Sequence, residues 1–148
     1  MMRSRLLLGF CAAAALLLAT EDANAAWIKV ETVTIDGVKN ALPSGSSIHR
    51  DYTQGGLYLF QLGIDSVGIS YGKKQGIPPT VSASVMVLSN ASGEGRFHSY
   101  GLSVDPGPQS FVYGGLPGED IGVEYFIEDP NPSGNSGRVN VTVFHWGN

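Results

Sequence analysis

A short polar stretch near the end of the chain carries a dense set of oxygen donors. Residues 128–137 read Glu-Asp-Pro-Asn-Pro-Ser-Gly-Asn-Ser-Gly and contain two carboxylates, two carboxamides and two hydroxyls. Calcium takes about six to eight oxygens from carboxylates, amide side chains and main-chain carbonyls. The same residue types also form ordinary turns, because Asn, Asp, Ser, Pro and Gly favour turn conformations. The residues alone therefore leave two interpretations open, a calcium-binding loop and a plain turn.

The three histidines lie in separate segments and belong to no catalytic motif. His145 alternates with valines, which favours a packed histidine, and His49-Arg50-Asp51 reads as a polar loop. The sequence contains no His-Glu-x-x-His and no phosphate-binding glycine loop. Two carboxylates placed across a cleft, as in glycosidases, leave no sequence signature. We therefore expect a non-enzymatic binding module, with a small glycan-active enzyme as a lesser alternative.

The first residues have the layout of a secretory signal peptide. Arg3 and Arg5 precede an apolar run over residues 6–19, and Ala-Asn-Ala at 23–25 is suited to signal peptidase. The run is too short to span a bilayer comfortably. Cys11, the only cysteine, falls inside this segment. We therefore expect residues 1–25 to be removed, which leaves a secreted or periplasmic chain without disulfides.

Residues 26–148 are expected to form a single domain that is large enough to bury a core. The net charge is −4 and the basic residues are scattered. A nucleic-acid partner is not expected, because binding a polyanion needs a clustered basic face. No second apolar run is long enough for a membrane span.

Apolar and polar residues alternate with a two-residue period along much of this domain. Ile121, Val123, Tyr125 and Ile127, for example, occupy one face of the segment that they share. Such alternation is typical of half-buried β-strands. The strand-like segments are 27–35, 57–62, 67–71, 81–88, 96–104, 110–113, 121–128 and 138–145. Short strands separated by turn residues predict an all-β fold, an antiparallel β-sandwich or jelly roll.

Four stretches, taken in chain order, resemble the PA-IL-like galactophilic lectin family, calcium-dependent galactose-binding lectins of bacteria. Ala26-Trp27 is similar to the family's N-terminus, and Ile69-Ser70-Tyr71-Gly72 to the end of one of its strands. Ser84-Val85-Met86-Val87-Leu88 is similar to a central strand. Residues 129–143, Asp-Pro-Asn-Pro-Ser-Gly-Asn-Ser-Gly-Arg-Val-Asn-Val-Thr-Val, resemble the calcium loop and the last strand. Each stretch is short, and the resemblance depends on their common order along the chain.

The resemblance implies a sandwich of jelly-roll or galactose-binding-domain-like type with calcium at one end. By matching position, Asp129 would supply a carboxylate to the ion, Tyr71 and Ser133 their carbonyls, and Asn135 a side-chain oxygen. Two vicinal hydroxyls of a sugar would complete the calcium shell, since a diol can replace water on a hard cation. The carbohydrate would then contact Tyr71, Asp129, Pro130 and Asn135. The resemblance also implies a homo-oligomer.

The chain departs from the family pattern at two places. The loop after Asp129 is shorter than in the family, and the segment from Gly72 to Thr80 lacks the His-Pro-x-Gln stretch that contacts the sugar there. Other aromatic side chains could face a sugar or simply pack in the core: Tyr71, Tyr100, Phe111, Tyr113, Phe126 and Trp146. The prediction is a calcium-dependent, galactoside-type lectin. The alternative is a metal-free protein-binding module, such as a hydrolase inhibitor or an adhesion subunit.

Overall fold

The computed structural model describes residues 25–63, 65–72, 79–89, 96–103, 109–116 and 119–147. The signal peptide predicted at residues 1–25 lies outside this part of the chain, apart from Ala25. The elements are β1 (Ala26–Asp36), β2 (Ala41–Leu42), β3 (Ile48–Tyr52), β4 (Gly56–Leu62), β5 (Gly68–Ser70), β6 (Ser82–Ser89), β7 (Arg96–Ser103), β8 (Ser110–Gly115), β9 (Ile121–Glu128), the 3₁₀ helix η1 (Pro132–Gly134) and β10 (Ser136–Gly147). No helix within the described ranges is long and apolar enough to cross a membrane.

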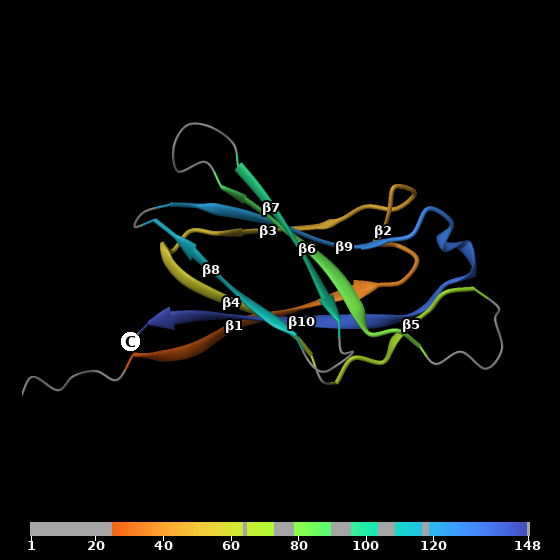
Figure 1. The fold of residues 1–148 in the computed structure, drawn as a ribbon, viewed down its shortest axis with the longest axis horizontal. Coiled ribbons are helices and arrows are strands. Elements are labelled where there is room, and N and C mark those ends of the chain that lie inside the picture. The colour runs from red at the N-terminus through yellow and green to blue at the C-terminus, as the bar shows by residue number, and fades with distance from the viewer. Residues whose placement is uncertain are drawn as a thin grey trace, which may run out of the picture.

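The strands form two sheets that pack against each other (Figure 1). The first sheet has the order β1-β10-β4-β8, with β5 also paired to β10, and the second has the order β2-β9-β6-β7, with β3 also paired to β9. The short β2 runs parallel to β9, and the other paired strands are antiparallel. The all-β sandwich predicted from the alternation is confirmed.

The core lies between the sheets and consists of the apolar side chains of each alternating set. On β10, Val139, Val141 and Val143 are fully buried, and on β6 the same is true of Val85 and Val87. The other buried members of the core cluster are Val33, Ile35, Tyr52, Tyr58, Phe60, Leu62, Ile69, Ala83, Leu102, Ile121, Val123, Tyr125 and Ile127. Each buried Val, Leu, Ile or Phe side chain contributes about 1.5–3 kcal/mol through burial, before the entropy of ordering the chain is subtracted.

Most of the aromatic residues pack in the core or along its edge. Tyr100 of β7 stacks on Phe111 of β8 with ring centroids 3.8 Å apart, and Phe111 stacks on Phe60 at 4.9 Å. These rings close the side of the sandwich where β7 and β8 are the outer strands of their sheets. Among the aromatic residues considered as sugar platforms, Tyr71 and Trp146 are the most open, with 37% and 40% of their surfaces exposed.

The prediction of a polar loop at His49-Arg50-Asp51 is wrong, because these residues belong to β3. This edge strand pairs along its whole length with β9. The Tyr52 hydroxyl lies in the core, donates to Glu31 Oε1 at 2.7 Å and lies 2.7 Å from the Tyr125 hydroxyl. Burial raises the pKa of both tyrosines, so both remain neutral donors at ordinary pH. The buried Tyr52 and the pairing with β9 therefore keep this segment in a strand, although most of its residues are polar.

On the opposite face of β3, His49 joins two carboxylates. Its Nδ1 lies 2.7 Å from Glu124 Oε1 and its Nε2 lies 2.9 Å from Asp51 Oδ1. Both ring nitrogens can donate at once only when the imidazole is protonated. These hydrogen bonds, that of Glu124 above all, raise the pKa of His49 above its ordinary value of 6.5. The protonated imidazole therefore helps to hold β3 against β9.

A pH dependence of stability follows from this arrangement. Because the folded-state pKa of His49 is raised, its stabilising contribution is complete below pH 6.5 and is lost as the pH rises through the folded pKa. We expect the free energy of unfolding to fall modestly above pH 6.5, since the side chain is half-exposed and solvent screens it. Urea titrations across this range should show a flatter profile for His49→Gln. Parallel profiles for the two proteins would contradict the assignment.

Candidate functional site

The predicted calcium loop and the predicted tyrosine are neighbours in the folded chain. Ser70, the last residue of β5, pairs with Ser136, the first residue of β10. Gly72 lies so close to Gly134 that a Cβ added to Gly134 would come within 3.1 Å of the Gly72 Cα. Tyr71, between Ser70 and Gly72, therefore lies beside the loop between β9 and β10.

Hydrogen bonds hold this loop from within. Asp129 Oδ1 accepts from the Asn131 N–H at 2.8 Å, and Asp129 Oδ2 accepts from Asn135 Nδ2 at 2.8 Å. The second hydrogen of Asn135 Nδ2 is donated to the Gly37 carbonyl, also at 2.8 Å. Asn135 is buried, with 9% of its surface exposed. Two acceptors around one amide nitrogen fix the orientation of the amide. The Asn135 side chain therefore links the loop to Gly37, which directly follows β1.

The same hydrogen bonds bear on how well the loop fits calcium. Asn135 turns its nitrogen toward Asp129, whereas a cation shared by the two residues needs an oxygen from each. Turning the amide over would place its oxygen against the Gly37 carbonyl. Within the described ranges no group of three or more His, Cys, Asp or Glu side chains could hold a metal ion, so calcium here would need carbonyl or amide oxygens in addition to any carboxylate. The arrangement of Asp129 and Asn135 does not fit a calcium ion between them.

The other two predicted loop residues are accessible. Pro130 is exposed, and its carbonyl accepts from the Ser44 hydroxyl at 3.3 Å. Ser133 is exposed in η1, and its hydroxyl donates to Asn131 Oδ1 at 3.3 Å. Of the residues predicted to contact a sugar, Asn135 is buried, and both hydrogens of its amide nitrogen are donated to other groups of the protein. Tyr71 is the one that borders a hollow described next.

A hollow opens where two strands of the second sheet separate. The β6–β9 ladder ends at the pair Ser84 and Phe126. Beyond this pair β9 turns toward β2, and the Ile127 N–H donates to the Asn40 carbonyl at 2.9 Å. The start of β6 continues instead along β7, with Ser82 opposite Ser103. The diverging strands leave a space of ≈ 440 Å³ between them.

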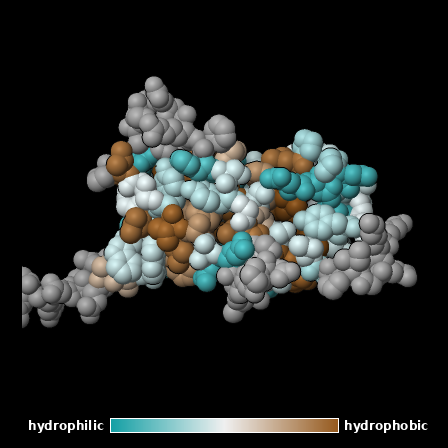
Figure 2. Space-filling model, in the orientation of Figure 1, coloured by the Kyte–Doolittle hydropathy of each residue, from teal (hydrophilic) through white to brown (hydrophobic). Residues whose placement is uncertain are grey.

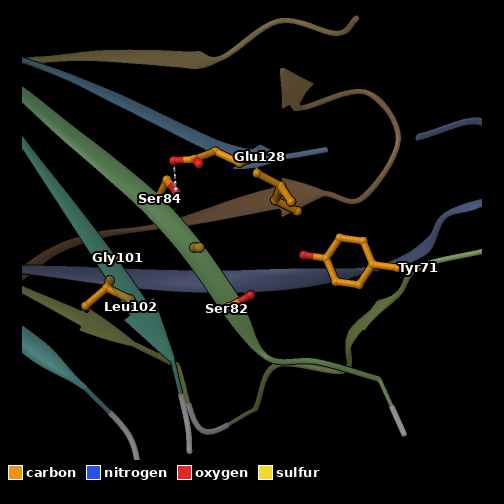
Figure 3. Close-up of a pocket in the computed structure, with 8 residues that line it drawn as sticks. Tyr71, Ser82, Ser84, Gly101, Leu102 and Glu128 are labelled. Carbon is orange, nitrogen blue, oxygen red and sulfur yellow. Dashed lines mark hydrogen bonds between the residues drawn. The ribbon is translucent and has the colours of Figure 1, made fainter. Parts of the chain in front are cut away.

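The lining of this hollow combines one aromatic ring with small polar groups. Figure 3 shows the Tyr71 ring pointing from the β5 side toward Ser82 and Glu128, with the Ser84 hydroxyl bonded to the Glu128 carboxylate. Ser84 Oγ donates to Glu128 Oε1 at 3.1 Å, and Glu128 is exposed. The described residues that line the hollow are Tyr71, Ser82, Ala83, Ser84, Gly101, Leu102, Ile127 and Glu128. This is a concave site with a few convergent polar groups, the usual form of a small-ligand site.

The surface around the hollow differs in character from the other end of the molecule. Figure 2 shows brown gathered over the region where β4 and β8 lie in Figure 1, whereas the half that carries β5 and the end of β9 is mostly teal and white. Leu57 of β4 and Val112 of β8 are among the exposed apolar side chains, at 42% and 50%. The hollow therefore lies in the more polar half.

Sequence reasoning missed most of the residues that line the hollow. Ser82 and Ser84 alternate with the buried Ala83 and Val85, so their outward direction is readable from the sequence. Serine hydroxyls on the outer face of a strand could therefore have indicated a polar binding surface there. The separation of β6 from β9 carries no local signal, because the hydrogen bonds to β2 that cause it join residues far apart in the chain.

The chain was also compared with known proteins. No protein-family model matches it, and a search of curated proteins found no match. Fold and site together define a β-sandwich protein with a polar, aromatic-edged hollow at one end.

Proposed function

We propose that this protein is a non-enzymatic carbohydrate-binding protein that holds a neutral sugar in the hollow between β6 and β9. The observation that carries the proposal is the combination of the exposed Tyr71 ring with the Ser82 and Ser84 hydroxyls and the Glu128 carboxylate around one space of ≈ 440 Å³. Pockets for small molecules commonly measure about 300–1,000 Å³.

Each of these groups can make a specific contact with a pyranose ring. An aromatic face packs against the apolar C–H face of a sugar, and burying that surface is favourable. The Glu128 carboxylate accepts charge-assisted hydrogen bonds from hydroxyls, which are stronger than those between neutral groups. The serine hydroxyls both donate and accept. A carboxylate also repels anions, and the chain carries a net charge of −4, so a neutral sugar is favoured over an acidic one.

Binding should depend strongly on Tyr71. We expect Tyr71→Ala to weaken sugar binding about tenfold or more, which corresponds to about 1.4 kcal/mol. A glycan array would identify the sugars bound by the wild type, and calorimetric titration would give the change in Kd. Trp146→Ala is the matched control, because Trp146 is exposed to a similar extent but does not line the hollow. If no sugar binds, or if the two variants weaken binding equally, the proposal fails.

Several finer expectations from the resemblance stay predictions. They are preference for galactosides, calcium dependence, export from the cell and assembly into a homo-oligomer. The protein-binding alternative would use the loop that carries the exposed Pro130 and Ser133. Capture of a protein by that loop, with an empty glycan array and insensitivity to Tyr71→Ala, would favour the alternative.

A further inference from the structure

A second hollow adjoins the first along β7. It measures ≈ 550 Å³ and lies between the edge strands of the two sheets. Its lining comprises Ser99, Tyr100, Gly101, Leu102, Gln109, Ser110 and Phe111. Gly101 and Leu102 line both hollows, so the two spaces meet at this point of β7.

The junction is open because Gly101 has no side chain there. A Cβ added to Gly101 would meet no heavy atom within 4 Å in the part of the chain that the structure describes. The backbone of Gly101 is not in the left-handed region, so a larger residue would not be strained. Gly101 pairs with Ser84, whose hydroxyl belongs to the first hollow. A ligand can therefore pass over Gly101 from one hollow into the other without meeting a side chain of that residue.

The second hollow suits the same chemistry as the first. Ser99 and Ser110 are exposed hydroxyl residues on the two edge strands. Tyr100 adds an aromatic ring that is fixed by stacking on Phe111. Among the described residues that line this hollow, none is charged. Hydroxyls and aromatic rings without charge are suited to a neutral polyhydroxylated ligand and not to an anionic one.

We propose that the two hollows form one groove for a neutral oligosaccharide, with one end of the ligand at Tyr71 and Glu128 and the following sugar units over Gly101 toward Tyr100 and Ser110. This rests on the proposed function, because the first sugar occupies the site described above. Each hollow alone is within the size range of a small-ligand pocket, so together they exceed the needs of a single sugar. The ligand class is thus an oligosaccharide chain.

The test compares short and long probes on the wild type and two variants. The probes are methyl β-galactoside with a β-linked galactose tetrasaccharide, and methyl β-glucoside with cellotetraose as a second series. We expect the tetrasaccharide of the series that binds to have a Kd about tenfold lower than its monosaccharide. Gly101→Trp should remove this gain, whereas Gly101→Ala should keep most of it. Thermal unfolding would check that the variants are folded.

A second variant guards against a folding defect. Ser99→Trp fills the far hollow from an exposed position that does not line the first hollow, so it should remove the gain with length and leave monosaccharide binding unchanged. Equal Kd values for mono- and tetrasaccharide on the wild type, or a gain that survives both tryptophan variants, would overturn the extended groove and leave the proposed function standing. Absence of binding for every probe would overturn both.

Discussion

Replacing Gly137 by alanine is expected to lower the free energy of unfolding by about 3 kcal/mol or more. Gly137 has φ = 96°, a conformation that side chains rarely adopt. A Cβ at this position would overlap the carbonyl oxygen of Gly68 on β5. Backbone atoms cannot move aside as a flexible side chain can, so the pairing of β5 with β10 would have to break. Denaturation in urea, followed by fluorescence, would measure the loss.

Gly72→Ala is the matched control for this effect. Gly72 also has a positive φ, 75°, but a Cβ there would meet no atom of the described residues within 4 Å. We expect only the backbone cost of about 1–2 kcal/mol. The difference between the two variants isolates the collision with Gly68 from the strain that both share. Equal losses would show that β5 is not held against β10 as described.

The Gly137 substitution should also weaken sugar binding at the proposed site. Tyr71 directly follows β5, and the position of its ring depends on the pairing of Ser70 with Ser136. If β5 separates from β10, the edge of the hollow is lost with it. We expect sugar affinity to fall in parallel with stability in Gly137→Ala.

Asn135→Ala is expected to cost about 2–3 kcal/mol, because it leaves the Gly37 carbonyl and Asp129 Oδ2 without their donor. This loss should appear in EDTA, since it arises from hydrogen bonds within the chain. Asn131→Ala is the control, because Asn131 is exposed and its side chain, among the described residues, is hydrogen-bonded only to the exposed Ser133, at 3.3 Å. It should change stability by about 0.5 kcal/mol or less. Chemical denaturation of the three proteins would measure these differences.

The same measurements, repeated with calcium, test the ligand role implied by the lectin resemblance. An ion that binds only the folded state at a hundred times its Kd adds about 2.7 kcal/mol. Stabilisation of the wild type by calcium, absent from Asp129→Ala, would establish Asp129 as a ligand. If calcium changes the stability of neither the wild type nor Asp129→Ala, then Asp129 and Asn135 stabilise the loop by hydrogen bonds and do not bind calcium. If Asn135→Ala is destabilised only when calcium is present, the stabilising role of the Asn135 hydrogen bonds to Gly37 and Asp129 is refuted.

Local sequence determined the fold class and most of the strands. Side chains alternate across a strand with a period of two, so a buried face is visible in the sequence wherever the strand lies on a core. Residues 121–128 illustrate this, because β9 has the predicted bounds and Ile121, Val123, Tyr125 and Ile127 are buried.

Only the tertiary structure decided how the polar residues are used. The strand character of His49 comes from β9, the amide orientation of Asn135 comes from Gly37, and the hollow beside Glu128 exists because β9 leaves β6 for β2. In each case the partner lies far away along the chain, and hydrogen bonding and burial act only once the chain has folded. The oxygen donors between Glu128 and Gly137 are visible in the sequence, but their hydrogen-bond partners are determined by the tertiary structure.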